Sequence, residues 1–439
     1  MQTCQKCYTD NMKKGRASNK LIIGFFAIII LGGIILFLPI STEEGHRLSL
    51  IDSMFISASA LCVTGLTPVD ISVTLSMFGR VVLAILIQVG GMGFATFAVF
   101  FLLLLRQNVS FSQRNLAQEA LNQETGRGIV SLVKFIFIAS GAIEIIGAAV
   151  LAAAFAATGM KTSTSIGMGV FHSISAFNNA GFDLFGNSFC DYSSNAALNI
   201  TISSLIILGG IGFFVMDDIL HGKRWRKLSF HTKIVLFVTL CLIIGGGLVI
   251  KATSPELTWM ESFFLSISSR TAGFNSVDTG SLTVPATMAV IVLMFIGASP
   301  GSTGGGIKTS TFFTVLIAVR HVIAKRETSA FRRRISKDSI LKAFSVMTLF
   351  LFASIIAVFL ICAVETGLQF MDVLFEVVSA IGTVGLSRGI TGKLGAFSKT
   401  ILIMVMFIGR LGPLTIVSSL SSEKQNPFLH CVEERVIIG

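Results

Sequence analysis

The chain has 439 residues, of which 53% are hydrophobic and only 13% are charged, and its formal net charge is +11. Because a soluble domain carries about 25% charged residues, this composition excludes a soluble globular protein and indicates a protein that crosses a membrane several times. Of the 34 lysines and arginines, 24 fall in five segments, 1–20, 106–134, 216–233, 320–342 and 421–439, so the positive charge follows membrane topology and does not indicate binding to nucleic acid.

Apolar runs long enough to cross a hydrocarbon core about 30 Å thick lie at 21–40, 129–155, 340–364 and 400–420. The first run is too long for a secretory signal and lacks a small-residue cleavage site, so we expect a retained first helix. The basic segments alternate with poorly charged ones, which by the positive-inside rule puts both termini in the cytoplasm. The basic loops there could contact anionic membrane lipids.

One unit occurs four times along the chain: a long apolar helix, a short apolar stretch, a glycine loop and a second long helix. The glycine loops read ALCVTGLTP, AFNNAGFDL, SRTAGFNSV and AIGTVGLSR, and they align on Gly65, Gly181, Gly273 and Gly385. A second glycine follows 24 to 28 residues later in each unit, at Gly90, Gly209, Gly297 and Gly409. We expect the units to span 21–105, 129–220, 230–323 and 340–420, between cytoplasmic tails at 1–20 and 421–439.

The short stretch before each loop would rise only about 12 to 15 Å as a helix, so it can enter half the membrane and turn back. Backbone at membrane depth is tolerated where it lines water or is buried in protein. Four glycine loops around one axis would present a ring of carbonyl oxygens that can replace the hydration shell of a cation. The candidate ion-binding residues are Val63, Thr64, Gly65, Asn179, Ala180, Gly181, Thr271, Ala272, Gly273, Thr383, Val384 and Gly385. The alternative is four extracellular turns between packed helices.

The second long helix of the third unit is interrupted by GASPGSTGGG, residues 297–306. A helix cannot continue through this composition, and we expect the broken stretch to act as a gate below the glycine loops. The gating candidates are Gly297, Ser299, Pro300, Gly301, Gly304, Gly305 and Gly306. The alternative is a kink that eases packing. Although the stretch imitates a phosphate-binding loop, Ile307 separates Gly306 from Lys308 and the required spacing fails, so we expect no bound nucleotide.

Arg410 lies in an apolar helix, where a charged side chain should face a wet cavity or a partner. We include it among the gating candidates because its charge would repel a passing cation. The alternative is a buried ion pair without a role in permeation. Two further charges at membrane depth, Arg270 and Glu144, could pair with each other and brace the third glycine loop.

The sequence offers little for an enzyme. It lacks H-E-x-x-H, and the seven cysteines and six histidines do not complete a zinc site. The pattern G-x-S-x-G occurs at Gly297 to Gly301 and at Gly385 to Gly389, but inside a glycine-rich break of a helix and inside the fourth glycine loop, and not at the strand-to-helix turn that a nucleophile elbow requires. We expect Cys62 to be a small packing residue and His172 to be packed or hydrogen-bonded. The chain is therefore not expected to be an enzyme.

The motifs SAFNNAGF, RTAGFNS, GASPGSTGGGIKTSTF and MFIGRLGPLT together resemble the Trk/Ktr/HKT superfamily of cation-translocating subunits, and within it the KtrB group. The resemblance covers about residues 20–420. It implies an all-α polytopic protein with eight transmembrane helices and four re-entrant pore helices, arranged as four M1-P-M2 repeats around one pseudo-fourfold pore. It also places Arg410 on the fourth M2 helix, facing the pore.

The function that this resemblance implies is potassium uptake across a bacterial plasma membrane, because all four filter positions hold glycine. It further implies a homodimer that sits on a cytosolic ring of nucleotide-binding regulatory subunits, and it leaves open a role for sodium as an activator. One departure is the first loop, Cys62 to Gly65, whose residue order differs from that of the fourth. The alternatives are a less selective sodium/potassium transporter and an ion-coupled secondary transporter.

Overall fold

The computed structural model describes residues 2–107, 109–121, 128–222, 225–325 and 327–420, and the predicted tail at 421–439 lies outside them. Within these ranges the protein is helical apart from loops and one short hairpin, β1 (Ser329–Ala330) and β2 (Arg333–Arg334). The all-α prediction is confirmed.

The helices before residue 222 belong to the first two predicted units. The first unit contains α1 (Gln2–Phe37), α2 (Leu50–Leu61), α3 (Ile71–Thr74), α4 (Met77–Met92) and α5 (Phe94–Leu104), and α6 (Phe111–Ala120) follows it. The second unit contains α7 (Ile129–Ala157), α8 (Thr162–Phe177), α9 (Ala196–Ile211) and α10 (Phe213–His221).

The helices after residue 229 belong to the last two units. The third unit contains α11 (Phe230–Thr253), α12 (Trp259–Ser268), α13 (Val284–Phe295) and α14 (Thr309–Ile323). The fourth contains α15 (Lys337–Val364), α16 (Phe370–Gly382), α17 (Ala396–Leu411) and α18 (Pro413–Leu420). The segment between α13 and α14 contains residues 297–306, where the composition predicts a break.

Three of the second helices of the units are shorter than the sequence predicts. Helices α4, α9 and α17 each end after 16 residues, immediately before Gly93, Gly212 and Gly412. These glycines have φ of 79°, 93° and 83°. This positive-φ conformation ends a helix, and residues with a Cβ rarely adopt it. The chain bends by 101° between α4 and α5 and by 93° between α9 and α10. The apolar run at 400–420 is likewise divided at Gly412 into α17 and α18.

Among the residues that the structure describes, four helices are long and apolar enough to cross a membrane, namely 19–37 of α1, α7, α11 and α15. The number rises to six if each bent pair counts as one span. These helices carry large apolar side chains on their exposed faces, such as Ile145 (72% exposed) and Phe359 (70% exposed), as expected for contact with lipid tails. The protein is thus a multi-pass membrane protein, while the number of eight spans stays a prediction.

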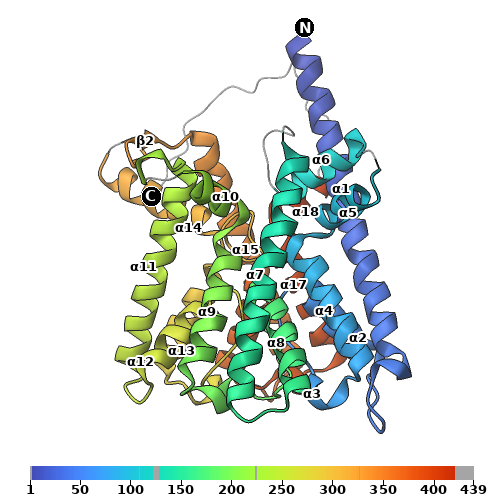
Figure 1. The fold of residues 1–439 in the computed structure, drawn as a ribbon. Helices are drawn as coiled ribbons and strands as arrows, with labels where there is room; N and C mark the ends of the chain where they lie inside the picture. Colours follow the sequence, from blue (N-terminus) through green and yellow to red (C-terminus); the bar gives the residue numbers. More distant parts are fainter. Residues whose placement is uncertain (1, 108, 122–127, 223–224, 326, 421–439) are drawn as a thin grey trace.

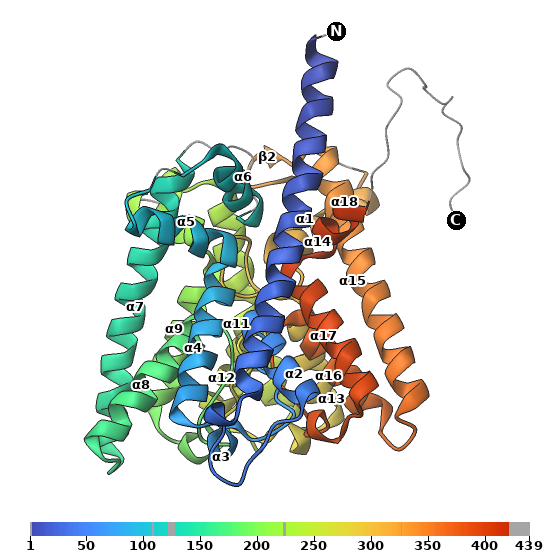
Figure 2. The same ribbon diagram turned by 90° about the vertical axis from the view of Figure 1, so that its right-hand side faces the viewer.

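The four short helices α2, α8, α12 and α16 lie in the same half of the molecule (Figures 1 and 2). Helices α5, α6, α10 and α18 and the β hairpin lie at the opposite end, where the described basic loops also gather. Glycines let the short helices pack closely against the long ones: a Cβ on Gly32, Gly147 or Gly246 would lie within 2.6 Å of the hydroxyl of Ser57, Ser173 or Ser266. In the first three units the short helix therefore packs directly against the long helix that precedes it.

Candidate functional site

The four glycine loops form a closed ring. A Cβ built on Gly65 would lie 2.4 Å from the carbonyl oxygen of Ala180, and one on Gly181 would lie 2.2 Å from that of Ala272. The same holds from Gly273 to Val384 (2.2 Å) and from Gly385 back to Thr64 (2.1 Å). Each glycine thus touches the carbonyl of the next loop, in the order one, two, three, four, one. Segments far apart in sequence therefore surround a single axis.

Each of the four ring glycines has a positive φ, with values of 93°, 68°, 79° and 97° in chain order. Glycine adopts this conformation without the steric cost that a Cβ brings, so both the backbone angle and the packing require glycine at these positions. The predicted ion-binding residues are the backbone segments of this ring, and their eight non-glycine residues are at most 3% exposed. Gly181 and Gly273 are also buried, whereas Gly65 and Gly385 are partly exposed.

Serines at the ends of the short helices hold the loops in place. The Ser59 hydroxyl accepts from Gly65 N–H and the Ser379 hydroxyl accepts from Gly385 N–H, both at 3.0 Å. In the second and third loops, Ser175 and Ser268 instead donate to the carbonyls of Phe182 and Phe274. The backbone of each loop is thereby fixed from the side away from the axis.

The third loop differs from the other three because its serine lies five residues before the glycine, whereas the other serines lie six residues before it. The other loops contain a residue with positive φ between the helix and the ring: Val63 (57°), Asn179 (58°) and Thr383 (51°). Thr271 is not among the positive-φ residues. In the third loop the segment between the serine and the ring glycine is thus one residue shorter than in the others. Aligning the four loops on their glycines conceals this difference.

The segment 297–306 lies directly under this ring. Thr303 Oγ1 accepts from Asn179 Nδ2 (2.9 Å) and donates to the Phe177 carbonyl (3.1 Å), and Gly305 N–H donates to Thr383 Oγ1 (3.0 Å). Asn179 Oδ1 in turn accepts from Thr271 Oγ1 (2.9 Å). The segment is therefore hydrogen-bonded to residues that lead into the second and fourth loops.

The two ends of this segment run side by side, with Ile296 and Ile307 forming a parallel bridge. Ser299 N–H donates to the Gly210 carbonyl (3.1 Å) and Gly306 N–H to the Gly409 carbonyl (3.3 Å), so backbone bonds attach the segment to α9 and α17. Pro300 and Gly301 form the turn against Gly212 and Phe214. Lys308 Nζ donates to the Gly304 carbonyl (2.6 Å). The predicted gating residues thus form one hydrogen-bonded hairpin-like loop and not a simple helix kink.

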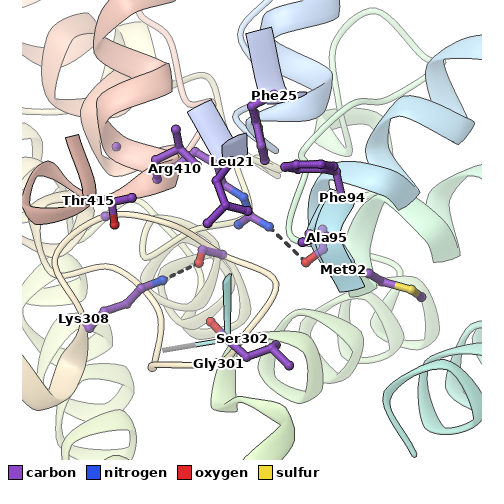
Figure 3. A pocket seen from close by; sticks show the side chains of 18 of the residues that line it. Leu21, Phe25, Met92, Phe94, Ala95, Gly301, Ser302, Lys308, Arg410 and Thr415 are labelled. Carbon is purple, nitrogen blue, oxygen red and sulfur yellow. Dashed lines mark hydrogen bonds between the residues drawn. The ribbon is translucent and has the colours of Figure 1, made fainter. Parts of the chain in front are cut away.

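Arg410 joins this loop to the first unit. Its guanidinium donates to the Thr303 carbonyl, to the Gly90 carbonyl and, at 3.0 Å, to the Gly91 carbonyl. Figure 3 shows Arg410 and Lys308 on the wall of one pocket, which Ser302 also lines. No described carboxylate forms an ion pair with Arg410. Within the described residues, Arg410 therefore bonds to backbone carbonyls, and the alternative of a buried ion pair is not observed.

The pocket has a volume of about 220 Å³ and lies on the side of the loop away from the ring. Its lining combines apolar side chains of α1, such as Leu21 and Phe25, with Arg410 and Lys308 and the glycines that end α4 and α17. The ring, the loop and the pocket therefore follow one another along the molecule.

The predicted pairing of Glu144 with Arg270 is wrong. The Glu144 carboxylate accepts from Gln88 Nε2 (3.0 Å to each oxygen) and from Asn178 Nδ2 (3.1 Å), and Asn178 Nδ2 also donates to Gln88 Oε1 (2.8 Å). This network supports the second loop, because Asn178 immediately precedes Asn179. Gln88 and Asn178 are uncharged and belong to no recognisable motif, so nothing in the sequence indicates that they meet.

The fourth loop has its own polar support on the outer side. Glu376 of α16, 1% exposed, accepts from the hydroxyls of Ser387 (2.8 Å) and Thr391. Arg388 pairs with Asp372 at 2.7 Å and donates to the Thr279 carbonyl at 3.0 Å. The segments that follow the third and fourth loops are thereby connected.

The remaining sequence predictions concern His172 and Cys62. His172 is buried; its Nδ1 lies 2.8 Å from the Met168 carbonyl and its Nε2 accepts from Leu184 N–H (3.3 Å), so it is hydrogen-bonded as expected. Cys62 is a buried free thiol in the apolar core. Among the described residues, groups of His, Cys, Asp and Glu that could hold a metal ion are absent.

Comparison with known proteins gives one consistent family. The model of a family described as TrkH, cation transport protein, matches residues 8–250 and 229–428. The chain is 41% identical to the Ktr system potassium uptake protein B of Bacillus subtilis, over 92% of this chain and 93% of that protein. It is 36% identical to the potassium/sodium uptake protein NtpJ of Enterococcus hirae, over 95% and 96% of the two chains. Among solved structures, the potassium transporter TrkH from Vibrio parahaemolyticus matches with a TM-score of 0.72 and 19% identity, covering 91% of this chain and 84% of that one.

Proposed function

Because this chain belongs to the TrkH family of cation transport proteins, we propose that it is the pore subunit of a potassium-uptake system. The observation that carries this proposal is the closed ring in which each filter glycine touches the carbonyl of the next loop. A relative 41% identical over nearly the whole length is named a potassium uptake protein, which supports potassium as the cation.

In the proposed mechanism the ring is a selectivity filter. Backbone carbonyls of the segments 63–65, 179–181, 271–273 and 383–385 replace the water around a potassium ion. The short helices point their partly negative carboxyl ends toward the same point. The ion is the transported substrate, and its coordination uses backbone atoms, so the different side chains of the four loops are compatible with one function.

The loop 297–306 is the proposed gate. Its bonds to Thr383, Asn179 and Arg410 support a closed position directly under the filter. Opening would require the loop to move away and to exchange these bonds for others. Arg410 has two roles in this proposal: it holds the loop, and its positive charge forms an electrostatic barrier below the filter.

The position of the protein in the cell and its partners belong to the same proposal. We place the chain in a bacterial plasma membrane with both termini in the cytoplasm, since the basic loops gather at one end of the molecule (Figure 2). We expect a homodimer on a cytosolic nucleotide-binding ring, with sodium as a candidate activator and without a nucleotide bound to this chain. A relative's name, Ktr system, supports an assembly of several subunits. Catalytic chemistry is not part of the proposal.

The test is growth and initial rubidium uptake at low external potassium in a bacterium that lacks its own potassium uptake, with and without a cognate ring subunit. We expect the parent chain to restore both, and Gly65→Ser to lose uptake or to admit sodium at equal amounts of protein in the membrane. If uptake does not return in either background, the proposal is wrong. Sodium that competes equally with rubidium in the parent would instead favour the less selective sodium/potassium transporter.

A further inference from the structure

The third residue before each ring glycine lies behind the filter, and its identity differs in all four loops: Cys62, Asn178, Arg270 and Gly382. Arg270 is 7% exposed. Its Nε has no hydrogen-bond partner, and the described carboxylates do not form an ion pair with it. A guanidinium cannot lose its proton in a protein, so an unpaired positive charge stands directly beside the third filter strand.

The second and third units show why Arg270 lacks a partner. Gln88 lies two residues before Gly90, and the matching residue two before Gly209 is Ile207. Glu144 lies three residues before Gly147, which packs on Ser173; Ile243 lies three before Gly246, which packs on Ser266 in the same way. The polar groups that serve Asn178 are thus replaced by isoleucines around Arg270.

A small cavity of about 10 Å³ lies against Arg270, lined by Ile207, Gly210, Thr239 and Thr271 among others. The Thr239 hydroxyl, which is also buried, has no partner either. The cavity has room for about one water, which could accept from Arg270 Nε and bond to Thr239. It is too small for a carboxylate or a phosphate, so a bound anion of that kind does not neutralise the charge.

We propose that Arg270 is a specificity-determining residue whose uncompensated charge, solvated by one buried water, weakens the binding of the cation in the third quarter of the filter. Arg270 follows α12, whose carboxyl end is the negative pole of the helix dipole. The guanidinium offsets that pole in the third unit. In the second unit an acidic side chain, Glu144, stands behind the matching residue. The ring therefore has an acidic side chain behind its second strand and a basic one behind its third.

This inference rests on the proposed function, because it assumes that the ring binds the transported cation. The charge on Arg270 should raise the KM for rubidium and speed the release of the ion. For unit charges about 10 Å apart at an effective permittivity of about 20, Coulomb's law gives about a tenfold change in affinity. We therefore expect Arg270→Gln to lower KM about tenfold, with a maximal rate that is unchanged or lower.

Two further variants separate charge from structure. Arg270→Lys keeps the charge and should keep the KM of the parent. Ile243→Glu leaves Arg270 in place and supplies the carboxylate that the second unit has at Glu144, so it should lower KM as Arg270→Gln does. Because Arg270→Gln and Ile243→Glu neutralise the charge independently, either of these two variants that reaches the membrane decides the matter. Arg80→Gln is the matched control, since Arg80 bonds to the Ser72 and Leu75 carbonyls on the outer side and should leave KM unchanged.

The measurement is the concentration dependence of initial rubidium uptake, normalised to protein in the membrane, in chloride and in gluconate media. An unchanged KM in Arg270→Gln and Ile243→Glu overturns the inference, and so does an equal effect of Arg270→Lys and Arg270→Gln. A KM in the parent that depends on chloride also overturns it, because the charge would then be neutralised by a bound anion. Absence of rubidium uptake by the parent, with the ring subunit present, would instead count against the proposed function.

Discussion

The glycine ring and the loop beneath it are two layers of the proposed pore, and they are built on different principles. The ring is made four times, from backbone, and its contacts repeat: each glycine lies against the carbonyl of the next strand, with projected Cβ distances of 2.1 to 2.4 Å. The loop occurs once. Besides its backbone bonds to α9 and α17, it is held by individual side chains, namely Thr303, Thr383 and Arg410.

Because of this difference, the two layers tolerate different substitutions. A filter of carbonyls accepts varied side chains as long as glycine supplies the left-handed turn, which is why Val63, Asn179 and Thr383 can hold corresponding positions. The loop depends on the identity of a few donors and acceptors, since each hydrogen bond contributes only about 1 kcal/mol. Mutations in the ring should therefore stop transport, whereas mutations in the loop should change the rate of transport.

The largest effect is expected for Gly273→Ala. The new Cβ would lie 2.2 Å from the Val384 carbonyl at a φ of 79°, so the fourth strand must move; the left-handed backbone alone costs about 1 to 2 kcal/mol. We expect at least about a hundredfold loss of initial rubidium uptake, at normal amounts in the membrane. Gly245→Ala is the control in the same unit, because its Cβ would meet no atom within 4 Å.

The next effect, opposite in sign, is expected for Arg410→Gln. Removing the guanidinium releases the loop from the carbonyls of Thr303, Gly90 and Gly91. Since a hydrogen bond to a charged group contributes about 1.5 to 3 kcal/mol, the open state should gain at least about tenfold in population. Initial rubidium uptake by cells without a ring subunit measures this gain.

Arg410→Lys is the informative comparison for that variant. It keeps the positive charge but cannot reach three carbonyls at once. If uptake rises in both Arg410→Gln and Arg410→Lys, the rise is due to the loss of the hydrogen bonds that attach the loop. A rise in Arg410→Gln alone assigns it to the electrostatic barrier. Slower uptake in both would contradict the proposed gate.

A smaller gain is expected for Thr303→Val, which has nearly the same shape. It removes the bonds of the hydroxyl to Asn179 and Phe177 but leaves the Thr303 carbonyl on Arg410. At about 0.5 kcal/mol for each of these two neutral bonds, the open state should gain about fivefold in population, which is below the gain in Arg410→Gln. Thr303→Ser, which keeps the hydroxyl, should behave as the parent. An equal gain in both variants would show that the hydroxyl does not hold the loop.

The same division explains how much could be predicted from the sequence. The ring glycines and the broken helix at 297–306 were predicted because glycine is required by the backbone, and such a requirement is visible in composition and spacing. The bends at Gly93 and Gly212 were missed although the same rule applies, because a glycine near the end of a long apolar run can also continue a helix at a cost of about 1 kcal/mol.

Side-chain networks could not be predicted. Glu144 was assigned to Arg270 because both are charged and lie at membrane depth, yet Glu144 bonds to the neutral Gln88 and Asn178. Charge identifies groups that need partners, whereas packing of the helices decides which partners are within reach. The one-residue shortening of the third connection is a similar case, since alignment on glycine conceals it.

The smallest effects, a test of equivalence within the ring, are expected for Ser59→Ala and Ser379→Ala. Each removes the acceptor of one glycine N–H, Gly65 or Gly385, at the same distance of 3.0 Å. The lost hydrogen bond contributes about 1 kcal/mol. Without it the strand should be held less firmly, so we expect the KM for rubidium to rise about fivefold, equally in the two variants. Ser268→Ala is the contrast, because Ser268 donates to the Phe274 carbonyl instead and its loss leaves the glycine N–H of the third strand untouched. Equal KM changes in Ser59→Ala and Ser379→Ala, with a different change in Ser268→Ala, would show that the first and fourth strands share one kind of support and that the third strand has another. Unequal KM changes in Ser59→Ala and Ser379→Ala would mean that the repeated backbone geometry does not confer equal function. The contrast between a repeated ring and a unique gate would then fail.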